Sequence, residues 1–145
     1  MKNEKEVKIN IVYNDFEGKP QIESVWAEKI DDNYKITNIP FFAYNIAYGD
    51  IVSVEEEDGQ LYFDELIEPS GHSTIQMIIT DKNDVKEIGD QLVDLGCDWE
   101  GSHIDRYISI DVPESLSYSP LKKYLESGRS AGKWDYKEAC LSHKY

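Results

Sequence analysis

The 145-residue chain is 40% hydrophobic and 12% aromatic, which is enough apolar sequence for one folded domain or two small lobes around a shared core. No segment approaches the roughly 18 consecutive apolar residues of a membrane span, and the charged start Met1–Glu6 has no signal-peptide pattern, so we expect a cytoplasmic protein. The net charge of −14 disfavours direct binding to nucleic acid or to anionic membranes, and 15 of the 29 acidic residues lie between Asp50 and Glu100, a stretch with only two lysines.

The first third of the chain predicts a three-stranded antiparallel meander. Apolar and polar residues alternate over 7–13, turn residues follow, and strand-like sequence resumes over 21–30 and again around 34–36. The next segment, 39–44, is rich in large apolar residues, but Pro40 disfavours a helical backbone at its start. We expect this segment to cover one end of a small barrel.

A β-hairpin is the clearest local feature. Strand-like sequence over 50–57 and 60–68 flanks Asp58-Gly59, a pair that suits a type I′ turn because both positions need positive φ. Another strand is expected over 75–79, where every second residue is large and apolar. Six short strands joined by tight turns are typical of a small antiparallel barrel or curled sheet of the SH3-like or OB-like kind.

The remaining sequence alternates between strands and helices. Residues 84–95 have helical periodicity, and residues 108–112 alternate as a strand. A second helix is expected from Ser119, which is followed by proline. A third helix is expected from Asp135, because Glu138 would complete a capping box with it.

The two halves together predict an α+β protein. A small antiparallel β-barrel or curled sheet would form the N-terminal lobe, residues 1–70, and a ferredoxin-like or half-ferredoxin βαβα lobe would form residues 71–145. Since the sequence has no internal repeat and no low-complexity linker, we expect residues 1–145 to fold as a single domain.

Six short segments occur in a recognisable order between about residue 22 and about residue 143. They are Val25–Glu28, Asn38–Tyr44, Gly49-Asp50, Glu68–Thr74, Leu95–Cys97 and Gly132–Cys140. In composition and order they resemble the bacterial family catalogued as domain of unknown function 4265. The resemblance implies a single co-folded unit, and it supplies no catalytic residues because the family name records no activity.

The segment around His72 is the candidate for a ligand-binding or catalytic site. It lies at the expected junction of the lobes, where pockets often form, and Glu68 could raise its pKa so that it acts as an acid or base. We group Asp50, Ser70 and Ser73 with it. The alternative is a structural histidine whose ring nitrogens bind a neighbouring serine or the backbone and hold the turn.

No metal ion or cofactor is expected. Cys97 and Cys140 lack the spacing of a zinc site, and we expect two buried thiols. The acidic residues near Asp81 lack the glycine and the bidentate glutamate of a calcium loop. The sequence also lacks the GxSxG pattern of a nucleophilic serine, so an enzyme is the less favoured class.

The acidic side chains of the middle third are the candidate partner-binding face. They belong to the hairpin tip, one helix face and the loop after it, which could merge into one surface: Glu55, Glu56, Glu57, Asp58, Glu87, Asp90, Asp94, Asp98 and Glu100. Trp99, in that loop, is the candidate aromatic anchor, the alternative being a partly buried loop residue. Like charges at this density destabilise the fold, and a basic partner would relieve the repulsion and bind quickly. The alternative is a solvated face that only confers solubility.

We therefore predict a non-enzymatic binding protein. An immunity protein or antitoxin-type inhibitor would use such a face to neutralise a basic toxin domain. The alternative is a small enzyme or ligand-binding domain that uses the lobe junction around His72. A third possibility is a regulator that docks on a larger basic assembly such as a ribonucleoprotein.

Overall fold

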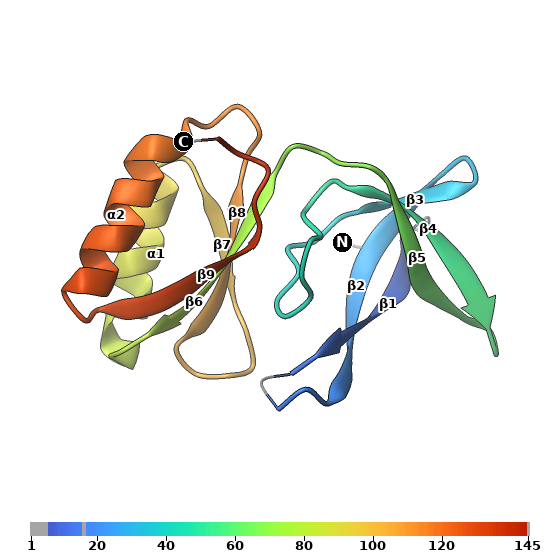
Figure 1. The fold of residues 1–145 in the computed structure, drawn as a ribbon, viewed down its shortest axis with the longest axis horizontal. Helices are drawn as coiled ribbons and strands as arrows, with labels where there is room; N and C mark the ends of the chain where they lie inside the picture. Colours follow the sequence, from blue (N-terminus) through green and yellow to red (C-terminus); the bar gives the residue numbers. More distant parts are fainter. Residues whose placement is uncertain (1–5, 16, 145) are drawn as a thin grey trace.

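Five strands build the N-terminal lobe of the structure, a computed structural model that describes residues 6–15 and 17–144 (Figure 1). They are β1 (Glu6–Asn14), β2 (Pro20–Ile30), β3 (Asn33–Ile36), β4 (Ile51–Glu57) and β5 (Gln60–Glu68). Each strand pairs antiparallel with the next, and a short parallel pairing of β1 with β5 closes the ring. The alternation predicted for β1 is confirmed, because Ile9 and Ile11 are buried while Lys8 and Val12 are exposed.

The β4–β5 hairpin has the turn that its sequence predicts. Asp58 and Gly59 have φ values of 52° and 79°, the positive values that a type I′ turn requires at both central positions. Val54 then lies opposite Phe63, and both pack against the core of the N-terminal lobe. Local turn chemistry therefore sets the register of this hairpin near its tip.

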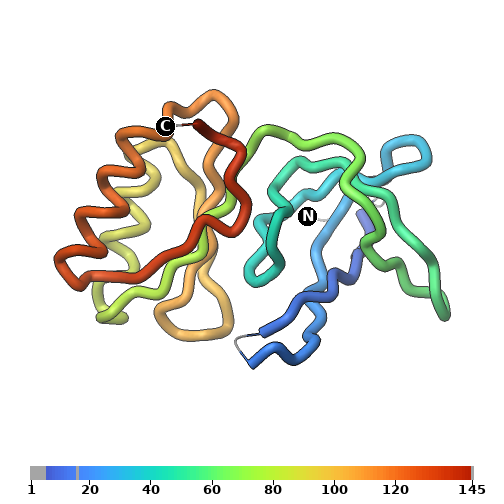
Figure 2. Tube along the Cα trace, viewed as in Figure 1, coloured from blue at the N-terminus to red at the C-terminus, as the bar shows by residue number. Residues whose placement is uncertain are grey.

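The segment of residues 37–50 joins β3 to β4 and lies between the two lobes (Figure 2). Ala43 and Ile46 belong to the core of the N-terminal lobe, as expected of a segment that covers one end of it. The buried Glu23 carboxylate accepts backbone N–H bonds from Phe41, Phe42 and Ala43 at 2.5, 3.0 and 2.9 Å. These bonds satisfy amides that have no strand partner, so an irregular backbone can be buried here.

The C-terminal lobe is a four-stranded antiparallel sheet with two helices on one face (Figure 1). Its elements are β6 (Ser73–Ile79), a 3₁₀ turn η1 (Lys82–Asp84), α1 (Val85–Asp94), β7 (Asp98–Gly101), β8 (Tyr107–Val112), α2 (Tyr118–Ser130) and β9 (Trp134–Cys140). The strand order is β7-β8-β6-β9. The predicted α+β class is confirmed, and no helix among the described residues is both long and apolar enough to cross a membrane.

Three predicted elements are corrected by the second sheet. The strand expected over 75–79 is β6, a central strand of the C-terminal sheet, so it belongs to the predicted 71–145 lobe and not to the barrel, and residues 73–77 are buried on both faces. The loop expected around Trp99 is the edge strand β7. The expected third helix is wrong: residues 134–140 form strand β9, which pairs with β6 at the other side of the sheet. The predicted βαβα order is therefore βαββαβ.

The N-cap of the second helix also lies two residues earlier than the cap that the sequence predicts at Ser119. Its N-cap is Ser117, so Ser119 and Pro120 both lie within the first turn. A proline is tolerated there because the first amides of a helix have no intrahelical acceptor. The helix ends after Ser130, and Gly132 turns the chain with a φ of 75° into β9.

Alternation within the C-terminal sheet separates an apolar face from a polar one. On β8, Ile108, Ile110 and Val112 pack under the helices. The intervening side chains face the N-terminal lobe, where Tyr107 and Ser109 donate hydrogen bonds to the carbonyls of Phe41 and Pro40 at 2.6 and 2.5 Å. The lobes therefore meet through side-chain donors of a sheet and carbonyl oxygens of the 37–50 segment.

Two residues of β6 extend this polar contact. Thr74 Oγ1 donates to the carbonyl of Ile46 at 3.1 Å, and Gln76 Nε2 donates to the carbonyl of Ala43 at 3.2 Å. Both side chains are fully or almost fully buried. Because a buried carbonyl without a donor is costly, the position of the 37–50 segment is specified by the sheet of the other lobe.

Candidate functional site

His72 forms a hydrogen-bond contact with a carboxylate that the sequence did not suggest. Its Nδ1 lies 2.8 Å from Oδ1 of Asp111, which projects from β8 and is 4% exposed. The expected partner, Glu68, is an exposed residue at the end of β5. Asp111 could have been found from the sequence, because it alternates with the core residues Ile110 and Val112 and so belongs on the opposite face of the strand.

The electrostatics of Asp111 combine burial with the neighbours His72, Asp98 and His143. Burial raises the pKa of its carboxyl, and Asp98 raises it further from the paired position on β7. The hydrogen bond and the charge of His72 oppose this rise. His72 therefore favours the ionised form of a carboxylate that its surroundings disfavour.

The other residues grouped with His72 have structural partners. Both carboxylate oxygens of Asp50 accept backbone N–H bonds, from Ala47 at 2.9 Å and from Ser70 at 2.8 Å. The Ser70 hydroxyl donates to the carbonyl of Tyr48 and accepts the amide of His72. Asp50 is 2% exposed, so its carboxylate fixes the backbone at Ala47 and Ser70 rather than lining a cavity.

Ser73 is likewise committed to the fold. Its Oγ lies 2.6 Å from Nδ1 of His143, and it accepts the backbone amide of Ser142. The His143 ring stacks on Tyr118, and its Nε2 lies 2.8 Å from the carbonyl of Pro113. Ser73 therefore holds the C-terminal segment against the sheet.

A hollow of about 370 Å³ opens beside His72 at the junction of the lobes. We name it the His72 hollow, and its lining comes from the 37–50 segment, the connection between β5 and β6, β7, and the end of β8: Thr37, Asn38, Ile39, Tyr48, His72, Asp98, Trp99, Glu100, Asp111 and Pro113. Thr37 Oγ1 is buried there and has no hydrogen-bond partner. Three carboxylates and one imidazole line this space, so it favours a cation or a hydrogen-bond donor.

The acidic groups do not merge into the single face that the sequence suggested. The β4–β5 tip, with Glu55, Glu56, Glu57 and Asp58, lies at one end of the long axis, and α1 lies at the other (Figure 1). The two remaining groups lie at the same end of the molecule, because α1 packs against β7 through Trp99, and Asp98 and Glu100 project from the other face of that strand. We name the exposed carboxylates of this end the β7 acidic edge, and they are Glu87, Asp90, Asp94, Asp98 and Glu100.

Trp99 lies at the centre of the β7 acidic edge. Its indole packs so closely on Gly89 of α1 that a Cβ at that position would lie 2.2 Å from the ring. The residue is half-buried and also lines the His72 hollow. The alternative prediction for Trp99, a partly buried residue, is therefore correct about its burial, but the residue lies in a strand and not in a loop.

The cysteines and the acidic clusters provide no metal centre. Within residues 6–15 and 17–144, no group of three or more His, Cys, Asp or Glu side chains is placed to hold a metal ion. Burial raises the pKa of the Cys97 thiol to about 12 and that of Cys140 to about 11. Both thiols are therefore protonated at neutral pH, and the prediction of a buried thiol is confirmed for Cys97, whereas Cys140 is half-buried.

Comparison with known proteins identifies one family and one similar structure. The profile of the family described as "Domain of unknown function (DUF4265)" matches residues 23–136. A hypothetical protein from Neisseria gonorrhoeae, known as a crystal structure, is similar over 99% of this chain and 100% of its own, with a TM-score of 0.84 and 31% sequence identity. A search of curated proteins finds no match.

Proposed function

The chain belongs to the DUF4265 family, and we propose that it is a non-enzymatic protein that binds a basic protein partner through the β7 acidic edge. The observation that carries the proposal is the junction of that edge with the His72 hollow: Asp98 and Glu100 are exposed and line the hollow. Lysine or arginine side chains of a partner could contact the edge and enter the hollow together. A partner cation buried in the hollow beside a carboxylate would exclude water, and the attraction between the two charges would be stronger there.

A toxin domain is the kind of partner that this charge fits best. Enzymes that act on nucleic acids or nucleotides carry basic clefts that attract phosphate, and an acidic inhibitor competes for the same surface. We therefore propose an immunity or antitoxin-type role. The concentration of exposed carboxylates on one helix and one edge strand supports it, because this arrangement gives fast electrostatic association.

Charge reversal at two matched sites tests the proposal. The partner would be captured from the native cell and compared with the product of the adjacent gene, and its association with the protein would be followed by stopped-flow fluorescence. We expect Asp98→Lys with Glu100→Lys to slow association about tenfold or more at low salt and to weaken its salt dependence. The same change of charge at the hairpin tip, Glu56→Lys with Asp58→Lys, is the control. Equal effects at the two sites would contradict a binding site at the edge.

A second candidate function, ligand binding or proton transfer, rests on the His72–Asp111 pair. A carboxylate at Nδ1 orients an imidazole for proton transfer at its other nitrogen. A small ligand whose affinity falls in His72→Gln, with the protein partner still bound at full affinity, would favour this candidate over the first. Loss of stability alone in that variant would favour a structural histidine.

Two finer structural assignments and a cellular location accompany the proposal. The βαββαβ order and the antiparallel pairing support a ferredoxin-like C-terminal lobe on a small N-terminal barrel. The hydrogen bonds between the 37–50 segment and β6 and β8 support a single folding unit. Two free thiols fit a reducing compartment, so we propose the cytoplasm.

A further inference from the structure

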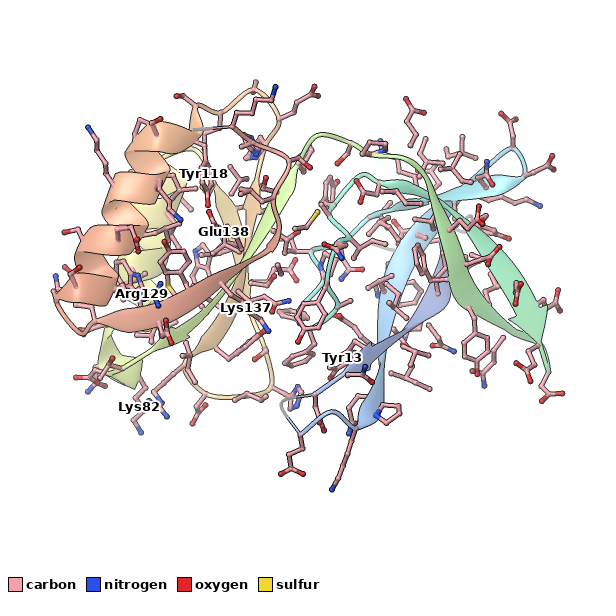
Figure 3. All side chains as sticks on the ribbon, in the orientation of Figure 1. Tyr13, Lys82, Tyr118, Arg129, Lys137 and Glu138 are labelled. Carbon is pink, nitrogen blue, oxygen red and sulfur yellow. The ribbon has the colours of Figure 1, made fainter. Side chains whose placement is uncertain are left out.

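A second and larger cavity, of about 450 Å³, lies between the lobes on the side of β9. We name it the aromatic groove. Its walls come from the end of β1, the 37–50 segment, the loop between β7 and β8, and the polar face of the sheet, and its lining includes Tyr13, Phe42, Tyr44, Gln76, Tyr107 and Lys137. Its volume is in the range that holds a small organic ligand. Figure 3 labels Tyr13 and Lys137 on the two facing lobes.

One wall of the groove is a continuous row of stacked rings. Phe42 stacks on Tyr13, with ring centroids 5.7 Å apart and planes 14° apart, and on Tyr107, with 5.1 Å and 29°. The Tyr107 hydroxyl donates to the carbonyl of Phe41, which fixes the position of its ring. A preformed row of rings favours a planar ligand, since little side-chain freedom is lost when the ligand binds.

The groove also exposes apolar side chains to solvent, whereas most of a protein surface in contact with water carries polar groups. Three large hydrophobic residues that line it are exposed: Tyr44 at 44%, Ile78 at 44% and Ile104 at 43%. Adjacent exposed hydrophobic residues in a concave site mark a binding site more often than isolated ones do. A ligand in the groove would cover this apolar surface.

Gln76 gives the groove a hydrogen-bond preference. The residue is 2% exposed, and its Nε2 donates to the carbonyl of Ala43, but its Oε1 is buried without any donor. A buried acceptor without a donor is unfavourable, and such atoms in native structures call for an explanation. A ligand N–H group beside Gln76 would supply the missing donor.

The charges at the mouth select the sign of the ligand. Asp15 and Asp135 both line the groove, and backbone hydrogen bonding lowers the pKa of Asp15 so that it stays ionised. The ammonium of Lys137 lies 4.4 Å from the centroid of the Tyr44 ring and 3.2 Å from its hydroxyl oxygen. Asp15 favours a cation, whereas Asp135 already pairs with Arg129 at 3.5 Å, and Lys137 competes with a bound cation for the aromatic surface.

We propose that the aromatic groove binds a cationic arylalkylamine, a small molecule with a flat aromatic ring, N–H donors and a positively charged ammonium group. This site is separate from the β7 acidic edge, so the proposal does not depend on the protein partner. The stacked rings supply the affinity for a flat ring, Gln76 accepts an N–H, and the Asp15 carboxylate attracts the ammonium group.

Tryptamine is the probe, and chemical shifts of backbone and side-chain amides report where it binds. We expect a saturable titration that moves the amides of Phe42 and Tyr107 and the side-chain amide of Gln76. Indole-3-acetate has the same ring with the opposite charge, and 2-cyclohexylethylamine has the same charge without a flat ring. Both should bind at least about tenfold more weakly, because each lacks one of the two features that the groove recognises.

Two variants locate the binding. Lys137→Gln should tighten tryptamine binding about two- to fivefold, as the loss of one nearby surface charge predicts, whereas Lys86→Gln on α1, the matched control, should leave it unchanged. Phe42→Leu should weaken it about two- to tenfold through loss of stacking. Equal binding of the cyclohexyl amine, no shift at the groove, or equal effects of the two lysine changes would overturn the proposal. So would shifts of the groove amides by the captured protein partner and by none of the amines.

Discussion

Gly128 on α2 is the position at which the structure predicts the sharpest effect of a single methyl group. A Cβ added there would lie 1.9 Å from Cζ2 and 2.2 Å from Cη2 of Trp134, so the indole would have to move. That ring is 4% exposed, its Nε1 donates to the carbonyl of Leu125 at 3.0 Å, and its centroid lies 5.0 Å from that of Tyr124. The ring is therefore held on several sides and cannot move without loss of packing.

The magnitude follows from two opposing terms. Forcing an extra methyl group into a packed core costs about 1–3 kcal/mol, and the rigid indole places this case near the upper end. Alanine is better than glycine inside a helix by about 1 kcal/mol. We therefore expect Gly128→Ala to lower the free energy of unfolding by about 2 kcal/mol, which for a chain of this length lowers Tm by about 4–8 °C.

Urea unfolding followed by tryptophan fluorescence measures this effect, and Gly89→Ala is the internal comparison. A Cβ at Gly89 would also meet an indole at 2.2 Å, but Trp99 is half-buried on an edge strand, so its ring is less confined than that of the buried Trp134. We expect Gly89→Ala to stay within about 1 kcal/mol of the wild type, because the helix propensity offsets a smaller steric cost. In a Trp134→Phe background the cost of Gly128→Ala should fall below about 0.5 kcal/mol, since the clashing atoms are absent. Wild-type or higher stability of the Gly128→Ala protein would refute the reasoning.

Three further predictions concern buried polar and thiol groups. Glu23→Gln should lower the free energy of unfolding by about 2 kcal/mol, because an amide –NH₂ would replace one acceptor of three buried N–H bonds; unchanged urea unfolding would contradict it. The raised pKa of Asp111 means that its contribution to stability is present below its ordinary value of 3.8 and is lost as pH rises through the folded-state pKa. Asp111→Asn should therefore remove this part of the pH dependence. If the free energy of unfolding varies with pH in the same way in the wild type and in Asp111→Asn, the prediction is wrong. With pKa values of about 12 and about 11, Cys97 and Cys140 should react with iodoacetamide at pH 8 at least about a hundredfold more slowly in the native protein than in guanidinium, as mass spectrometry can measure.

Elements whose signals are local could be predicted from the sequence. The period of two in β1, the Asp58-Gly59 turn and the apolar stripe of α1 each depend on residues within one element, and all three are present. The division between a strand-rich first half and a second half with helices followed from the same patterns. The concentration of acid between Asp50 and Glu100 is likewise a property of the sequence alone.

Elements whose conformation depends on distant partners could not be predicted. Asp135 and Glu138 have the spacing of a helix start, yet residues 134–140 pair with β6, and Trp134 is buried against Gly128. The gain from that pairing and burial exceeds a local capping preference of about 1 kcal/mol. Strand β7 is short and acidic, and its pairing with β8 makes it a strand.

The candidate sites show the same division. The sequence indicated His72 and the acidic residues, but tertiary structure decided which of them lie together. It placed Asp111 beside His72 and separated the hairpin tip from α1 by the length of the molecule (Figure 1). Composition determines how much charge a chain carries, whereas the direction of each strand and the packing of the two lobes determine where that charge meets a cavity. Neither the His72 hollow nor the aromatic groove exists before the 37–50 segment packs against the sheet, because each is lined by both.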